Sequence, residues 1–306
     1  MITVYFDASY NQASRSQPEP RLFYTVGCYM GEVDSWRKFR KEWRVELDRR
    51  GISDFHMNKF ERARSEVISG RELKPDNPYR GWTVKDFDSF INRLHKVLAR
   101  KRGPRKVALE GFGCSLSKTD FHAMLPDELR DQPECQSEYI FNVAINMQHA
   151  AMAAELRGLE GEIHYVFASG DGKGNHLQDW FRSLWRNKAA IKFFRLSKSY
   201  SHWGYEFTDA AHEPAIQAAD IAAYEFNKLA MHCAENNFMW NENVIRKSVL
   251  NLCRLPDNPY PLLLAGERIE KAFEAMIGWK KIFGASYGRI VRPPTQEELQ
   301  KQRVHV

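Results

Sequence analysis

The feature that most constrains the fold is an apolar run at the start of the chain, Ile2 to Phe6, followed directly by the carboxylate of Asp7. A β-strand that is buried on both faces has a continuous series of β-branched and aromatic residues, as this run has. The run therefore predicts a central strand in a sheet covered on both faces. An isolated buried carboxylate is costly to keep charged, so Asp7 needs a partner, a solvated position or a metal ion.

Strand and helix patterns follow one another along the rest of the chain. A second apolar run predicts a hairpin with the first strand. Helical spacing of apolar residues predicts four more helices beside the one in the β-α-β unit. The expected strands are 22–30 and 105–117, with a β-α-β unit over 162–197; the four helices are 32–51, 83–101, 137–157 and 212–230. Residues 52–61 are expected to form a short extended segment, and 66–81 a surface loop.

This order predicts an α/β fold with a mixed central sheet and helices on both of its faces. We expect one domain over residues 1–235, and a helical and loop extension over 236–306 that packs on it. The chain has 306 residues, of which 43% are hydrophobic and 27% charged, as in an ordinary globular protein.

Bulk properties favour a reducing compartment and are compatible with a polyanionic partner. The net charge is +6, which mildly favours nucleic acid. Five scattered cysteines without a CxxC pair argue against a disulfide framework and a zinc ribbon. The chain begins without a signal-peptide pattern, and no apolar stretch approaches the roughly 20 residues of a membrane span. We therefore expect a cytoplasmic protein with no membrane association.

Four acids stand at or near the ends of apolar segments: Asp7, Glu110, Asp171 and Asp220. Acids from separate segments that meet at the edge of a sheet can bind two divalent cations, which clamp the attacking and leaving oxygens of a phosphodiester. Oxygen ligands favour Mg²⁺ or Mn²⁺ over zinc. For each acid taken alone, the alternative is a turn cap or an arginine partner.

Asp220 is the most informative of these acids. It lies in the segment AIQAADIAAY, whose alanines allow a helix to pack close to a sheet. Gln217 precedes it by three residues, so the two side chains share one side of the helix. A carboxylate on the crowded side of such a helix indicates a specific role.

Four segments together resemble the domain of unknown function 3800 family: YFDASYNQ, DFHMNKFE, YVFASGDGKGN and AIQAADIAAYEF. The resemblance spans residues 1–229. It implies a ribonuclease H-like fold and metal-dependent nuclease chemistry, with Asp7 and Asp220 as metal ligands. It also marks His56, as a proton shuttle or a group that steadies the scissile phosphate.

One position departs from the family pattern. Many relatives have an acid where this chain has Ala168, in the sequence FASGD. Three interpretations remain open. The protein has diverged to a weaker or silent site, the alanine was introduced to silence it, or Asp171 or Glu110 supplies the missing charge.

Several polar residues are candidates for contact with a substrate: Gln217, Lys173 in the glycine-rich turn, and Arg102 and Arg105 in the basic loop RKRGPRK. Basic residues neutralise phosphates, and interleaved aromatic rings stack on unpaired bases. The corresponding alternative is an ordinary solvated surface.

The sequence thus predicts a nuclease that hydrolyses DNA or RNA with Mg²⁺ or Mn²⁺ held by Asp7, Asp220 and Asp171, with Glu110 and His56 as further catalytic candidates. The alternative is a catalytically inactive subunit of a defence or mobile-element assembly, which binds nucleic acid or a protein partner, including a second copy of the chain. Hydrolysis of another kind of substrate by an acid pair is a third hypothesis.

Overall fold

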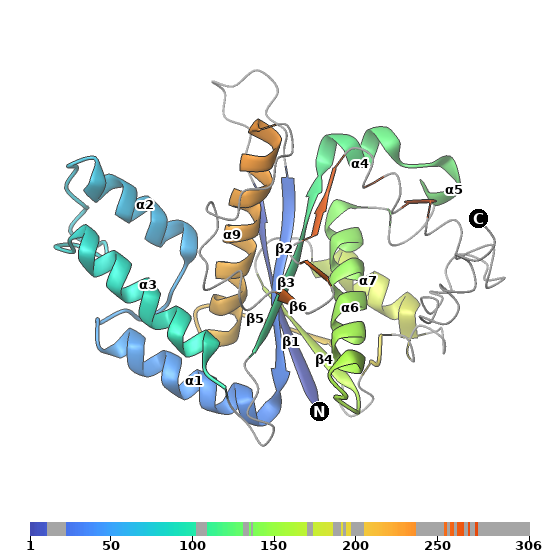
Figure 1. The fold of residues 1–306 in the computed structure, drawn as a ribbon, viewed down its shortest axis with the longest axis horizontal. Helices are drawn as coiled ribbons and strands as arrows, with labels where there is room; N and C mark the ends of the chain where they lie inside the picture. Colours follow the sequence, from blue (N-terminus) through green and yellow to red (C-terminus); the bar gives the residue numbers. More distant parts are fainter. Residues whose placement is uncertain are drawn as a thin grey trace.

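The computed structural model describes residues 1–10, 23–101, 109–130, 135, 137–169, 174–185, 191, 194–196, 205–236, 254–255, 258–259, 262–265, 269 and 273–274. Across these residues the fold is α/β, as the sequence predicts, with a mixed sheet between two layers of helices (Figure 1). The six strands of this sheet lie in the order β5-β4-β1-β2-β3-β8.

The strands are β1 (Ile2–Tyr10), β2 (Phe23–Glu32), β3 (Glu110–Ser117), β4 (Ile163–Ala168), β5 (Tyr205–Thr208) and β8 (Leu262–Leu264), with a separate pair β6 (Arg254–Leu255) and β7 (Asn258–Pro259). The helices are α1 (Val33–Asp48), α2 (Met57–Ile68), α3 (Val84–Ala99), α4 (Lys118–Met124), α5 (Asp127–Arg130), α6 (Glu138–Leu156), α7 (Gly174–Trp185) and α9 (Pro214–Glu235).

Strand β2 is antiparallel to both of its neighbours, whereas the other neighbouring strands of the large sheet are parallel to each other. The hairpin of β1 and β2 is therefore confirmed. Residues Ile2 to Phe6 are all buried, as expected for a central strand. Strand β1 continues to Tyr10, so Asp7 lies inside the strand and not at its end.

Side chains of β1 and β2 alternate between two helical layers. On one face, Tyr5 packs against Trp36 of α1, with ring centroids 4.7 Å apart. On the other face, Cys28 lies with its Sγ 3.7 Å from Asn146 Oδ1 of α6. Helices α1, α2, α3 and α9 form the first layer, and α6 and α7 belong to the second (Figure 1).

Helix α9 lies very close to the sheet over β2. A Cβ atom added at Gly27 would stand 2.2 Å from the backbone nitrogen of Ala223, so only glycine allows this approach. A buried polar contact fixes the helix along the strands, since Asn227 donates to the Thr25 hydroxyl at 3.0 Å. Thr25 in turn lies 2.9 Å from the Ser115 hydroxyl of β3.

The predicted long helices are confirmed, with ends close to those expected. Thr83 caps α3 in a reciprocal capping box with Asp86. Pro214 occupies the first turn of α9, where its missing N–H is least harmful. Among the helices in the described part of the chain, none is long and apolar enough to cross a membrane.

Three local predictions are wrong. Residues 57–68 form helix α2, in place of an extended segment that leads into a loop, because Met57, Phe60 and Ala63 share one buried side of a helix. Strand β4 is paired by β5, whereas in the segment expected as its partner strand, 190–197, the described residue Leu196 makes only an isolated parallel bridge to Ile163. Strand β8 comes from the region expected to be helices and loops, and it joins the sheet beside β3.

The close approach of α9 generates a stability prediction. We expect Gly27→Ala to lower the free energy of unfolding by about 1–3 kcal/mol or more, because its Cβ meets backbone atoms that cannot move aside. Gly31→Ala in the same strand is the matched control, since its nearest neighbour is the end of the Leu109 side chain. Urea denaturation of both variants checks this, and equal losses at the two positions would contradict it.

Candidate active site

Asp220 projects from α9 and is almost fully buried, with 7% of its surface exposed. Its Oδ2 atom accepts a 2.6 Å hydrogen bond from the backbone N–H of Met57, the first residue of α2. The side chain of His56, at the N-cap of α2, makes no capping bond. Asp220 therefore satisfies one of the free N–H groups at the start of α2, where the helix dipole favours a negative charge.

His56 lies between two carboxylates. Its Nδ1 atom is 4.0 Å from Oδ2 of Asp220, and its Nε2 atom is 3.1 Å from Oδ2 of Asp54. Lys59 also approaches Asp54, with its Nζ at 3.8 Å. The structure therefore brings His56 and Asp220 together, although 163 positions separate Met57 from Asp220 in the sequence.

The electrostatics of this cluster are dominated by burial. Burial raises the pKa of Asp220, and the Met57 N–H, His56 and Lys59 counteract only part of that rise. Burial also raises the pKa of Tyr79, and the charges of Asp54 and Asp220 raise it further. The Tyr79 hydroxyl therefore stays neutral, and Asp220 lacks enough positive charge around it.

The ties between α9 and β1 show where Asp220 lies along the sheet. At the start of α9, Arg40 donates from Nε to the Glu213 carboxylate at 2.9 Å, and its Nη2 donates to the Tyr5 hydroxyl. Near the other end, Asn227 donates to the backbone carbonyl of Ser9 at 3.5 Å. Helix α9 therefore runs in the same sense as β1.

Asp220 occupies the middle of this span. It follows Glu213 by seven residues and precedes Asn227 by seven, so all three lie on one side of the helix. On β1, Asp7 likewise lies midway between Tyr5 and Ser9, on the same sheet face. Asp220 is thus placed over the part of β1 that carries Asp7.

Ala168 lies on the strand next to Asp7. The parallel register of β1 and β4 pairs Phe6 with Phe167, and the next residue of each strand is Asp7 and Ala168. Residues at the same level of neighbouring strands point to the same face. An acid at position 168 would therefore stand beside Asp7.

Glu110 is not brought into this site. The strand register pairs Glu110 with Met30 and Met30 with Val4, which is three residues from Asp7 and therefore on the opposite face. There the Glu110 carboxylate pairs with Arg157 at 2.9 Å. Burial raises the pKa of Glu110, while Arg157 counteracts the rise.

Gln217 shares a side of α9 with Asp220, but its amide group already makes hydrogen bonds within the protein. It accepts from Trp43 Nε1 at 2.9 Å and donates to the carbonyl of Ala210 at 2.8 Å. Four other candidates lie outside the described residues: Asp171, Lys173, Arg102 and Arg105.

The His, Cys, Asp and Glu side chains of the described residues limit the kind of metal site that the protein can form. No group of three or more His, Cys, Asp and Glu side chains in the described part of the chain is arranged to hold a metal ion. Mg²⁺, however, commonly takes one or two carboxylates, with water and substrate phosphate completing its shell. Asp220, buried and short of positive charge, is a carboxylate of the kind that such an open site could use.

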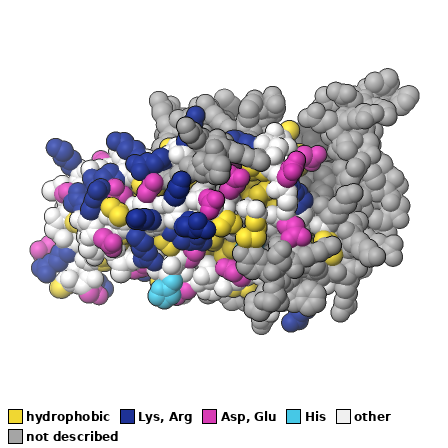
Figure 2. Space-filling model, turned by 90° about the horizontal axis from the view of Figure 1, so that it is seen from below, with side chains coloured by type: hydrophobic (Ala, Val, Ile, Leu, Met, Phe, Trp, Pro, Cys, Tyr) yellow, Lys and Arg dark blue, Asp and Glu magenta, His cyan; other side chains and the backbone are white. Residues whose placement is uncertain are grey.

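The positive charge of the protein is concentrated beside these acids. Residues 33–101 contain 18 Lys and Arg and 11 Asp and Glu, a net charge of +7, whereas the whole chain has +6. This segment forms α1, α2 and α3, and Figure 2 shows Lys and Arg side chains gathered over that end of the molecule. Such a surface attracts polyanions.

Comparison with known proteins gives no assignment: no protein-family model, no curated protein and no solved structure matches the chain.

Asp54 and Tyr79 are site residues that the sequence reasoning missed. Asp54 precedes His56 by two residues in an extended segment, so their side chains share a side, and this spacing is a usable signal. Tyr79 lies in a turn-rich segment without periodicity, and its sequence neighbours give no such signal.

The raised pKa of Asp220 predicts a pH-dependent stability. Because the folded-state pKa lies above the unfolded value, the wild-type protein loses stability as the pH rises through that interval. Asp220→Asn keeps an oxygen for the Met57 N–H and removes the charge. We expect this variant to melt at a higher temperature than wild type near pH 8, and the difference to shrink towards about pH 4.

Asp76→Asn, at an exposed position, is the control and should follow the wild-type profile. Melting temperatures across this pH range check the prediction. If the difference between Asp220→Asn and wild type were independent of pH, the raised pKa would be wrong.

Proposed function

We propose that this chain is a ribonuclease H-like, divalent-metal-dependent nuclease with an open site held by Asp7 and Asp220. The observation that carries the proposal is the meeting of buried Asp220 with His56, over the part of β1 that bears Asp7. The sheet order supports the ribonuclease H-like assignment, since three antiparallel neighbours, β1, β2 and β3, are continued by parallel β4 and β5.

Each residue of the site has a chemical role in this proposal. Asp7 and Asp220 hold Mg²⁺ or Mn²⁺, which polarises a phosphoryl oxygen when bound. The contact with Asp54 orients the His56 ring, with Nε2 towards Asp54 and Nδ1 towards Asp220. His56 then removes a proton from the attacking water, and Asp54 acts as its positioning residue.

The charge distribution supports nucleic acid as the substrate. The net charge of +7 over residues 33–101 lies on the helices that supply His56 and the N-terminus of α2. Lys and Arg on such a surface bind phosphates and release counterions, so the affinity should fall with salt.

A second function is favoured by Ala168. With no acid beside Asp7 on β4, metal affinity is reduced, and the protein then serves as a nucleic-acid-binding or partner-binding subunit without cleavage. Both functions use the same fold and the same charged surface, and they differ in whether the two carboxylates suffice for a working metal site.

Cleavage of labelled single-stranded and duplex DNA and RNA in Mn²⁺ tests the first function. We expect Asp7→Asn and Asp220→Asn to lower the rate about 100-fold or more, because each removes a charge that holds the cation. Glu110→Gln, on the opposite sheet face, is the matched control and should cleave like wild type. Metal-dependent cleavage that persists in both Asp variants would overturn the assignment.

Restoring an acid at position 168 separates the two functions. We expect Ala168→Glu to lower the Mn²⁺ concentration needed for half-maximal cleavage roughly tenfold, equivalent to about 1.4 kcal/mol of binding. Calorimetric titration with Mn²⁺ provides the same comparison without substrate. If wild type and Ala168→Glu neither bind Mn²⁺ nor cleave, but both bind nucleic acid, the binding subunit is the correct assignment.

A further inference from the structure

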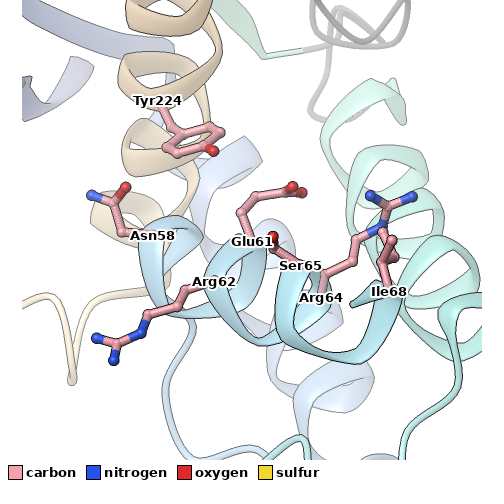
Figure 3. Close-up of a pocket in the computed structure, with 7 residues that line it drawn as sticks. All are labelled: Asn58, Glu61, Arg62, Arg64, Ser65, Ile68 and Tyr224. Carbon is pink, nitrogen blue, oxygen red and sulfur yellow. The ribbon is translucent and has the colours of Figure 1, made fainter. Parts of the chain in front are cut away.

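A pocket of about 480 Å³ opens between α2 and α9 (Figure 3). Its lining residues are Asn58, Glu61, Arg62, Arg64, Ser65, Ile68 and Tyr224. All but Tyr224 come from α2, and Figure 3 shows the Tyr224 ring extending from α9 towards α2. The pocket is therefore polar along one wall and aromatic on the other.

This pocket adjoins the acid site on both helices. Asn58 directly follows Met57, whose N–H holds Asp220. Tyr224 follows Asp220 by four residues in α9, so the two lie on the same side of the helix, one turn apart. A polymer whose phosphate is held through a cation at Asp220, as in the proposed function, would place its neighbouring unit in this pocket.

Two arginines and one glutamate line the pocket, and Arg64 already pairs with Asp88 of α3 at 3.0 Å. Figure 3 shows Glu61 directed into the space between the two helices, towards the side of Tyr224. A carboxylate repels a phosphate, but it accepts hydrogen bonds from the amino groups of cytosine and of other amino-bearing bases. The ring of Tyr224 offers a surface on which a base can stack.

Arg62 is suited to the backbone of the same ligand. In Figure 3 its guanidinium points away from Tyr224, and 80% of its side chain is exposed. Its partner Glu66 lies 3.3 Å away on the surface, and exposed ion pairs of this kind are weak. Arg62 can therefore exchange this contact for a phosphate at the rim.

We propose that the pocket binds an amino-bearing nucleobase, next to the scissile phosphate, of single-stranded nucleic acid. The base stacks on Tyr224 and donates its amino protons to Glu61, while Arg62 binds the backbone. In a duplex the pairing edge of the base is occupied, so the ligand must be unpaired. This inference rests on the proposed function for the position of the phosphate.

Binding in EDTA tests the pocket apart from catalysis. Fluorescence polarisation is measured with labelled twelve-residue oligo-dC, oligo-dA and oligo-dT. Thymine lacks an amino group, so we expect wild type to bind oligo-dC and oligo-dA about 5- to 100-fold more tightly than oligo-dT, as the loss of a specific base contact implies. A duplex should bind more weakly than oligo-dC.

Variants assign the preference to particular side chains. Glu61→Gln should bring the affinities for oligo-dC and oligo-dT close together, whereas Glu72→Gln, at an exposed acid outside the pocket, should leave the preference intact. Tyr224→Ala should weaken binding of every oligonucleotide about tenfold, and Tyr224→Phe should not. Circular dichroism confirms that each variant is folded.

Two results would overturn the proposed base binding in the pocket. One is equal affinity of wild type for oligo-dC and oligo-dT, and the other is an unchanged preference for oligo-dC in folded Glu61→Gln. The cleavage assay is read separately. Base preference without cleavage in any metal would support the pocket and reject the nuclease. Cleavage that depends on Asp220, without base preference, would support the nuclease and reject the pocket.

Discussion

The close approach of α9 to the sheet is the constraint on which the site depends. Gly27 allows the backbone of α9 to reach β2, and Asn227 fixes the position of the helix along the strands. With this placement Asp220 reaches the N-terminus of α2. A helix displaced by one residue would turn Asp220 by about 100° and separate it from that N-terminus, since α-helical residues follow one another at 3.6 per turn.

Asp220 has a structural and a chemical role that oppose each other. Its hydrogen bond to the Met57 N–H anchors α2 on α9, and thereby positions His56. Its burial also makes its charge costly, and His56 and Lys59 offset only part of that cost. A bound cation would resolve the conflict, because it supplies the missing positive charge at the buried carboxylate. In the proposed site, water or substrate phosphate would have to complete the cation shell, since β4 carries Ala168 and no acid beside Asp7.

Much of the fold could be predicted because its signals are local. Continuous apolar residues identified β1, and helical spacing with Thr83 as cap identified α3. Helix α2 was missed because it is short and mostly polar, so tertiary packing decides its structure. Of the candidate residues, the structure brings Asp220 and His56 together. Glu110 lies on the opposite face of the sheet, which depends on a strand register that the sequence does not reveal. The net charge of +7 over residues 33–101 becomes meaningful only when the structure shows that this segment forms α1, α2 and α3 on one side of the sheet.

The central proposal is that Asp7 and Asp220 together hold a divalent cation. A crystal soaked in Mn²⁺ tests it most directly, through the anomalous scattering of the metal. We expect an anomalous peak within coordination distance of a carboxylate oxygen from each of the two residues, and no such peak in Asp220→Asn. A peak elsewhere, or none between these carboxylates when Mn²⁺ is bound in solution, would contradict it.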